Sequence, residues 1–330
     1  MRICAPALTP IAPVSYNSPG MLKWRAAALA LAALVTSAGP QPRNNPFAGR
    51  WDITVTTDRD SYPDWMEVAD SGGEPQVRVQ PRSGSVHPVS GVELDGAHLD
   101  FVLSPASKTN PAVTWDLFVD SDKLSGTESR GTAVAHLSGV RAPELKRDPP
   151  ARWSEPEPLF NGKDLTGWEP AGAATSRWTA EEGVLVNTAR GANLKTTRKF
   201  DDFKLHIEFN CPNHGNSGVF LRGRYEVQVE YEPPEANDRF HAIGSIYGFI
   251  APSVALPRTP GEWETYDVTL VGRNVTVIRN GVTTIDHQEI PGITGGALDA
   301  NEGEPGPFYL QGDHNGRLQF RNITISLPKR

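Results

Sequence analysis

Cysteine is nearly absent from this chain of 330 residues, which contains only Cys4 and Cys211. Cys4 lies in an N-terminal segment that we expect to be removed, so the mature chain keeps one cysteine. A single thiol cannot form an internal disulfide, a CxxC redox pair or a zinc site built on several cysteines. We interpret Cys211 as a small core residue.

Basic charge and helical periodicity are also scarce. The formal net charge is −7, and no basic stripe is available to neutralise phosphates, so nucleic acid is not expected as a partner. No Gly-x-Gly-x-x-Gly segment follows a strand pattern, so no nucleotide cofactor is expected. No helical period is sustained after residue 40, whereas 29 prolines and 31 glycines favour turns and short strands. The sequence therefore predicts an all-β fold.

The N-terminus has the pattern of an export signal. Lys23 and Arg25 precede a short apolar run, and small residues follow it up to Ala38. This order is typical of a signal peptide, here residues 1–38 with Met21 as an alternative start. The apolar run is short for a membrane span, so no stable span is expected, with an uncleaved anchor as the alternative. We expect a periplasmic or secreted protein.

A first domain is predicted at residues 46–147, where short strand patterns alternate with turns. Residues 120–123 carry a hairpin signal between two of these strands. This pattern is typical of a small antiparallel β-barrel or sandwich. We interpret Trp51 and Trp115 as core residues, and the sequence indicates no role for the domain. Residues 148–156 are rich in proline and charge and predict a semi-rigid linker.

The second domain is predicted at residues 157–330, and two of its strands alternate apolar and polar residues. In residues 203–209 the polar face carries Glu208, and in residues 225–230 it carries Glu226, Gln228 and Glu230. Period-two alternation predicts one face on a core and the other toward water. Two such strands side by side would form a polar floor on a sheet, as expected of a sugar-binding site.

Several ordered motifs in this half resemble the 3-keto-disaccharide hydrolase domain, also described as a 3-keto-glucoside lyase and hydratase. The resemblance extends over about residues 157–328. The motifs are Leu159–Trp168, Phe203–Phe209, Asn216–Arg222, Tyr225–Gln228 and Gly316–Ile323. The resemblance implies a concanavalin A-like jelly-roll sandwich with a ligand-binding concave face, and action on small carbohydrates already oxidised at C3. The Asn280–Gly281 dipeptide, a type I′ hairpin signal between strand patterns, supports a sandwich independently.

A 3-keto sugar requires particular chemistry from such a floor. The ketone acidifies the proton on C2, a base removes it, the enolate expels the group on C1, and water adds back. Glu208 and Glu226 are candidate bases, and His314 is a further candidate. Arg222 is expected to stabilise the enolate, with a divalent metal ion as the alternative. Glu208, Glu226 and His314 are the candidate ligands for that metal.

Amide side chains supply the remaining contacts expected with a sugar. Asn216, Gln228 and Gln311 suit hydrogen bonds to hydroxyl groups, and His241 is a candidate at the rim of the site. A cross-strand ion pair between Glu208 and Arg222 is the structural alternative for those two residues. The oligomeric state is left open.

Three other functions are considered. In a retaining glycosidase the two carboxyl groups lie about 5–5.5 Å apart, whereas Glu226 and Glu230 would be separated by about 13 Å of strand. That spacing disfavours the usual two-carboxylate mechanism. A non-catalytic carbohydrate-binding module would use the same polar floor, because fold does not determine function. A structural surface protein is the third alternative.

Overall fold

All regular elements that the structure describes are β-strands, as predicted. The computed structural model describes residues 45–71, 74–172, 174–231, 238–314 and 316–329. No helix occurs within these ranges, so none of the described residues forms a helix long and apolar enough to cross a membrane. The predicted signal peptide, with Cys4 and Met21, lies outside the described residues.

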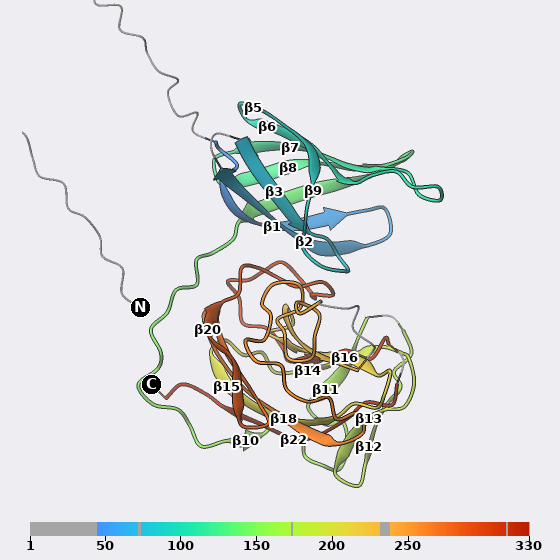
Figure 1. Ribbon diagram of the computed structural model, residues 1–330, viewed down its shortest axis with the longest axis vertical. Helices are drawn as coiled ribbons and strands as arrows, with labels where there is room; N and C mark the ends of the chain where they lie inside the picture. Colours follow the sequence, from blue (N-terminus) through green and yellow to red (C-terminus); the bar gives the residue numbers. More distant parts are fainter. Residues whose placement is uncertain (1–44, 72–73, 173, 232–237, 315, 330) are drawn as a thin grey trace, which may run out of the picture. The chain divides into compact units, whose positions relative to one another are not determined.

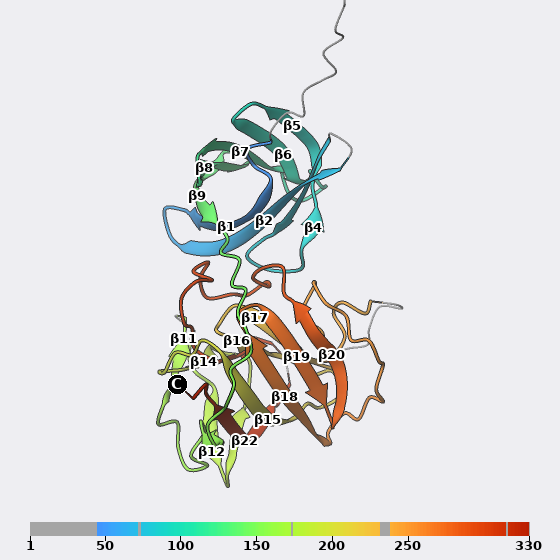
Figure 2. The same cartoon turned by 90° about the vertical axis from the view of Figure 1, so that its left-hand side faces the viewer.

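The first part of the chain forms one antiparallel sheet that curls into a nearly closed barrel (Figures 1 and 2). Its order within the described residues is β4-β3-β2-β1-β9-β8-β7-β6-β5. The strands are β1 (Gly49–Thr56), β2 (Ser61–Ser71), β3 (Glu74–Gln80), β4 (His87–Pro88), β5 (Ser90–Asp95), β6 (His98–Ser104), β7 (Val113–Asp120), β8 (Lys123–Arg130) and β9 (Ala133–Arg141). Trp51 and Trp115 are buried in the barrel core, as predicted.

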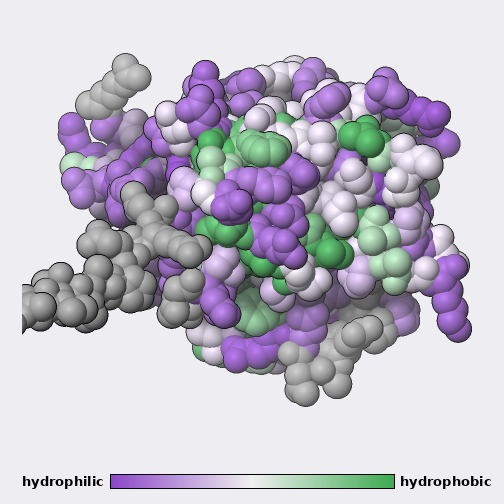
Figure 3. Space-filling view, turned by 90° about the horizontal axis from the view of Figure 1, so that it is seen from above, coloured by the Kyte–Doolittle hydropathy of each residue, from purple (hydrophilic) through white to green (hydrophobic). Residues whose placement is uncertain are grey.

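The outer surface of this sheet is largely polar because its strands alternate. In β7, Val113, Trp115 and Leu117 are buried, whereas the residues after Trp115 and Leu117 are exposed. Phe118 and Val134 are among the few exposed large apolar side chains. On the face of the molecule shown in Figure 3, apolar side chains gather in separate patches among polar ones.

The second part of the chain is a sandwich of two antiparallel sheets. The larger sheet runs β12-β13-β22-β15-β18-β19-β20, with β10 also paired to β22, and the smaller sheet runs β11-β14-β21-β16-β17. The larger sheet contains β10 (Glu157–Pro158), β12 (Trp178–Glu181), β13 (Val184–Asn187), β15 (Phe203–Asn210), β18 (Trp263–Val271), β19 (Asn274–Arg279), β20 (Val282–Glu289) and β22 (Gln319–Ser326). The smaller sheet contains β11 (Trp168–Ala171), β14 (Asn193–Thr196), β16 (Asn216–Leu221), β17 (Tyr225–Glu230) and β21 (Tyr309–Leu310).

One apolar core lies between the two sheets. Ile207 and Tyr266 contribute to it from the larger sheet, and Val219, Val227 and Leu310 contribute from the smaller sheet. The first four come from strands in which buried apolar residues recur at every second position, so one face of each sheet is apolar. The predicted jelly-roll sandwich is confirmed.

The hairpin between β19 and β20 has the predicted turn chemistry. Its two connecting residues, Asn280 and Gly281, have φ values of +50° and +77°. A type I′ turn needs positive φ at both positions, which asparagine and glycine tolerate best. The prediction of a type I′ hairpin is therefore confirmed.

The predicted pairing of two strands is wrong. β15 lies between β22 and β18 in the larger sheet, whereas β17 belongs to the smaller sheet, across the core. The predicted exposure of one face of β17 is also wrong, since all six of its residues are buried. A neighbouring segment runs along β17, where Gly244 N donates to Gln228 O at 2.9 Å and Tyr247 N donates to Glu226 O at 3.1 Å.

Candidate active site

The outward face of the smaller sheet carries a group of polar and aromatic residues. From here on we call this group the floor; unlike the floor predicted from the sequence, it contains no residue of β15. Val219, Leu221, Val227 and Val229 pack into the core, so the residues that alternate with them in β16 and β17 face the other way. The same alternation applies to β14 and β21, whose Leu194 and Leu310 lie in the core. The floor consists of Asn193, Gly218, Phe220, Glu226, Gln228 and Tyr309.

Glu226 lies directly on the backbone of the adjacent strand. β16 and β17 pair so that Gly218 lies opposite Gln228 and Phe220 lies opposite Glu226. A Cβ atom added at Gly218 would overlap the Oε1 atom of Glu226. Glycine within a strand often marks such a close approach. Gly218 therefore makes the room in which the carboxyl group of Glu226 lies.

The surroundings of Glu226 favour its protonated form. Its exposed fraction is 3%, and no hydrogen bond to its carboxyl group is formed among the described residues. Burial, with a smaller contribution from the negative charge of Asp313, raises the pKa of Glu226 well above its usual value of 4.5. A carboxyl group perturbed in this way can exchange a proton closer to neutral pH than an ordinary glutamate can.

Tyr309 on β21 is a second ionisable group on the floor. Its ring stacks on Phe220 with 4.3 Å between ring centroids, and its hydroxyl oxygen accepts a hydrogen bond from Asn193 Nδ2 at 2.5 Å. Burial, together with the negative charges of Asp313 and Glu226, raises the pKa of Tyr309 above its usual value of 10. The phenol is therefore neutral at physiological pH, and its proton is available for donation.

The segment after β21 carries a histidine–aspartate hydrogen bond and an unpaired acceptor. Gln311 N donates to Gly218 O at 3.0 Å, so this residue lies beside the floor. The side-chain Oε1 atom of Gln311 is buried and has no hydrogen-bond partner among the described residues. Further along, His314 Nδ1 lies 2.8 Å from Asp313 Oδ1. The hydrogen bond with His314, against the opposing effect of burial, lowers the pKa of Asp313.

The other predicted sugar-binding residues lie along β16, β17 and the segment beside them. Gln228 is buried next to Glu226 on the floor, and its Oε1 accepts from Val229 N at 3.2 Å. Asn216 begins β16, opposite Glu230. His241 is off the floor, and its ring nitrogens contact Asp238 Oδ2 and Ser85 Oγ.

Glu208 does not join this group. It lies on β15 in the larger sheet, where Arg321 Nε donates to it at 2.7 Å and Asn322 Nδ2 donates at 2.6 Å. Burial alone would raise the pKa of Glu208, but these two hydrogen bonds lower it. The structure thus separates the two carboxylates that the sequence predicted to share one surface.

Arg222 follows β16 and is fully buried. Its guanidinium group donates to Gly272 O at 2.7 Å, to Asp201 Oδ1 at 3.2 Å and to Tyr225 Oη at 3.3 Å. Tyr225 belongs to the core between the sheets. These partners give Arg222 a clear structural function at the end of β16.

The three predicted metal ligands are not brought together. Glu208 and Glu226 lie in different sheets, each on the face away from the shared core. Within the described ranges, no three histidine, cysteine, aspartate or glutamate side chains are placed to hold one metal ion. A metal site made from Glu208, Glu226 and His314 together therefore does not fit this geometry. The requirement for a metal stays a prediction.

Sequence reasoning missed Tyr309, Asn193 and Asp313. The signal for Tyr309 is weak, because β21 is a two-residue strand and Phe308 and Leu310 are the apolar neighbours that would mark it as outward-facing. Asn193 alternates with the buried Leu194 in a strand of four residues. Alternation over such short segments does not distinguish a strand from a loop.

Comparison with known proteins places this site in a family. The family model of the 3-keto-alpha-glucoside-1,2-lyase-like domain matches residues 155–326. A 3-keto-disaccharide hydrolase from Bacteroides thetaiotaomicron is 28% identical over 96 residues. That match covers 26% of this chain and 32% of the relative, so the similarity spans about a third of the relative's length.

Two solved structures from Parabacteroides distasonis, both carrying a glycosyl-hydrolase name, are also similar. One is 33% identical, covers 52% of this chain and 83% of its own, and has a TM-score of 0.44. The other is 22% identical, covers 52% and 92%, and has a TM-score of 0.43. The family match extends over more than half of this sequence and includes every floor residue. The chain belongs to the 3-keto-alpha-glucoside-1,2-lyase-like family.

Proposed function

We propose that this chain cleaves glycosides that carry a ketone at C3, with net addition of water. The observation that carries the proposal is the buried Glu226 carboxyl group on the floor, whose pKa is raised. The family match and the name of the curated relative support the same class of substrate. Glu226 is the group that we assign to proton transfer.

The reaction follows from the acidity of the C2 proton. Glu226 in its ionised form takes the proton from C2, and the electron pair forms an enolate with the C3 carbonyl. The enolate re-forms the C3 carbonyl as a C1–C2 double bond forms and the C1–O bond breaks, and the group on C1 leaves as its alcohol with the proton that Glu226 removed. Water then adds to C1, and C2 regains a proton, which restores the 3-keto sugar. The elimination product without water is the outcome of a lyase.

Two further side chains are suited to the intermediate. The neutral phenol of Tyr309 can donate a hydrogen bond to the C3 oxygen as its negative charge develops. The unpaired Oε1 of Gln311 can accept a hydrogen bond from a sugar hydroxyl. Arg222 was predicted for charge stabilisation, but its guanidinium group already has three partners. We therefore assign that function to Tyr309.

The test is release of the C1 group from 3-keto-trehalose by purified protein. We expect Glu226→Gln to lower kcat at least about 100-fold, as loss of a general base does. Tyr309→Phe is expected to lower kcat by about 100-fold, as loss of an oxyanion donor does. Glu208→Gln is the matched control and should retain activity. Full activity of Glu226→Gln would overturn the assignment.

The requirement for a metal is tested in the same assay with EDTA. Activity that survives EDTA supports acid–base chemistry by the floor residues alone. Activity that is lost with EDTA and restored by a divalent cation supports a metal ion as the group that stabilises the enolate. Either result would decide which group stabilises the enolate.

A carbohydrate-binding module is the second candidate, and one observation favours it. The unpaired Oε1 of Gln311 can accept a hydrogen bond from a sugar hydroxyl whether or not proton transfer follows. Binding of keto sugars without turnover would support this candidate.

We also propose that the protein is exported. Mass spectrometry of the mature N-terminus tests this, and we expect a chain that starts after Ala38.

A further inference from the structure

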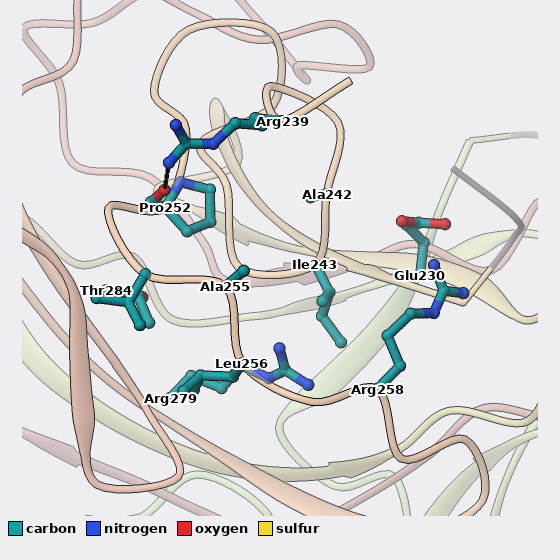
Figure 4. A pocket seen from close by; sticks show the side chains of 11 residues that line it. Glu230, Arg239, Ala242, Ile243, Pro252, Ala255, Leu256, Arg258, Arg279 and Thr284 are labelled. Atoms are coloured by element: carbon teal, nitrogen blue, oxygen red, sulfur yellow. Dashed lines mark hydrogen bonds between the residues drawn. The ribbon is translucent and has the colours of Figure 1, made fainter. Parts of the chain in front are cut away.

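A cavity of 190 Å³ lies at the end of β17, separate from the floor. Glu230, the last residue of β17, forms part of its wall, and Arg279 and Thr284 of β19 and β20 form another part. The remaining wall comes from the segment of residues 239–258. Figure 4 shows these side chains arranged around the cavity.

Most of the wall is apolar. It is formed by Ile243, Pro252, Val254, Ala255 and Leu256. Val254 is 45% exposed, so the cavity reaches the surface. An apolar cavity of about 150 Å³ accommodates a benzene ring. A pyranose of similar size would bury several hydroxyl groups against this apolar wall, at a cost in free energy. The donors Arg239, Arg279 and Thr284 in the wall already have hydrogen-bond partners within the protein. The cavity therefore suits an aromatic ring better than a second sugar.

Guanidinium groups surround this apolar wall. Arg279 is buried, and its Nε donates to Glu264 Oε2 at 2.6 Å. Arg258 lies over the ring of Tyr231 at 5.0 Å. Arg239 is exposed and lines another part of the cavity (Figure 4). Planar guanidinium groups pack favourably on aromatic faces, so their position strengthens the case for an aromatic ligand.

The cavity is held open by hydrogen bonds between its walls. Ser253 donates to Thr284 O from its main-chain N at 2.7 Å and from its hydroxyl at 2.8 Å. Arg239 Nη2 donates to Pro252 O at 2.5 Å (Figure 4). These bonds fix the segment against β20, so a ligand meets a preformed site.

The position of the cavity connects it with the floor. Glu226 and Glu230 lie on the same face of β17, about 13 Å apart along the strand, with Gln228 between them. A ligand whose sugar lies at Glu226 and whose next group extends along β17 would reach the cavity. We propose that the cavity binds an aromatic group on C1 of the keto-glycoside. This inference rests on the proposed function, because it assigns the sugar to the floor.

The experiment compares phenyl and methyl α-glucosides that have been oxidised at C3. We expect kcat/KM to be at least tenfold higher for the phenyl substrate. Ala255→Trp fills the cavity and is expected to lower the ratio of phenyl to methyl kcat/KM severalfold while leaving methyl substrate turnover unchanged. A preference that comes only from phenol being the better leaving group would keep the same ratio in this variant. Leu256→Asn should do the same by making the wall polar. Val282→Trp is the matched control, because Val282 is 40% exposed on β20 and does not line the cavity.

Binding of the unoxidised phenyl and methyl α-glucosides, measured by calorimetry, separates the two proposals. Selective binding of the phenyl compound that Ala255→Trp abolishes, without cleavage of either keto substrate, would refute the proposed function and support the cavity. Equal treatment of phenyl and methyl compounds by the wild type would overturn the cavity assignment. The cavity assignment would also be overturned if both cavity variants had the melting temperature of the wild type and lost the same factor in kcat/KM for the phenyl and the methyl substrate.

Discussion

At the scale of single residues, the site depends on how Glu226 is buried. The sequence placed a carboxylate at this position, and the structure adds the reason for its altered chemistry, which is a glycine in the adjacent strand. Gly218 leaves room for the carboxyl group but supplies no hydrogen bond to it. Burial without a donor favours the neutral acid. No pattern in one strand reveals this, since it requires the register of two strands.

The raised pKa of Glu226 predicts a pH-dependent stability difference. Above pH 4.5 the unfolded wild type releases the proton that the folded wild type retains, so its stability falls as pH rises toward the folded pKa. Glu226→Gln has no such loss. The free energy of unfolding of the variant minus that of the wild type should therefore increase by about 1.4 kcal/mol for each pH unit in this interval. Urea unfolding of both proteins at pH 5 and pH 7 measures this stability difference. A difference that is the same at both pH values would contradict the burial of the acid.

The contact at Gly218 predicts a specific loss of activity. Gly218→Ala should displace the Glu226 carboxyl group and lower kcat at least tenfold, since misplacement of a catalytic group by about 1 Å can cost about 100-fold. Kinetics with 3-keto-trehalose measure this, with circular dichroism to verify the fold. Gly281→Ala, at a positive-φ turn far along the chain, is the control for general glycine effects. Equal losses of activity in both variants would count against a positioning function.

At the scale of elements, the sequence predicted strands well and their partners poorly. Alternation in residues 203–209 and 225–230 showed which side of each strand is apolar, and both apolar sides do face the core. Alternation carries no information about which strands pair, because long-range pairing depends on the whole topology. Local turn chemistry was more informative, as Asn280–Gly281 shows.

The placement of β15 predicts that Glu208 acts only on stability. Its carboxylate pairs with Arg321 on β22, and both side chains are partly exposed. Pairs of this kind contribute about 0–1 kcal/mol. Glu208→Gln should therefore lower the free energy of unfolding by no more than about 1 kcal/mol, with kcat on 3-keto-trehalose within twofold of wild type. Denaturant unfolding and kinetics test both parts, and a large loss of kcat would return Glu208 to the candidate bases.

At the scale of the whole molecule, the proposed function predicts that this protein acts after another enzyme, because its substrate must already carry a ketone at C3. On β17, Glu226 and Glu230 are too far apart for the retaining two-carboxylate mechanism. The C2 proton of an ordinary glycoside lacks the adjacent ketone that makes it acidic.

Trehalose should therefore be stable in the presence of this protein, and 3-keto-trehalose should be cleaved. Chromatography of the released sugars compares the two substrates, and prior treatment of trehalose with a C3-specific sugar oxidoreductase is the matched control. Reduction of the ketone by borohydride should abolish cleavage of the oxidised substrate. Glucose release from untreated trehalose would instead require a direct displacement or oxocarbenium mechanism, with carboxyl groups other than the Glu226 and Glu230 pair.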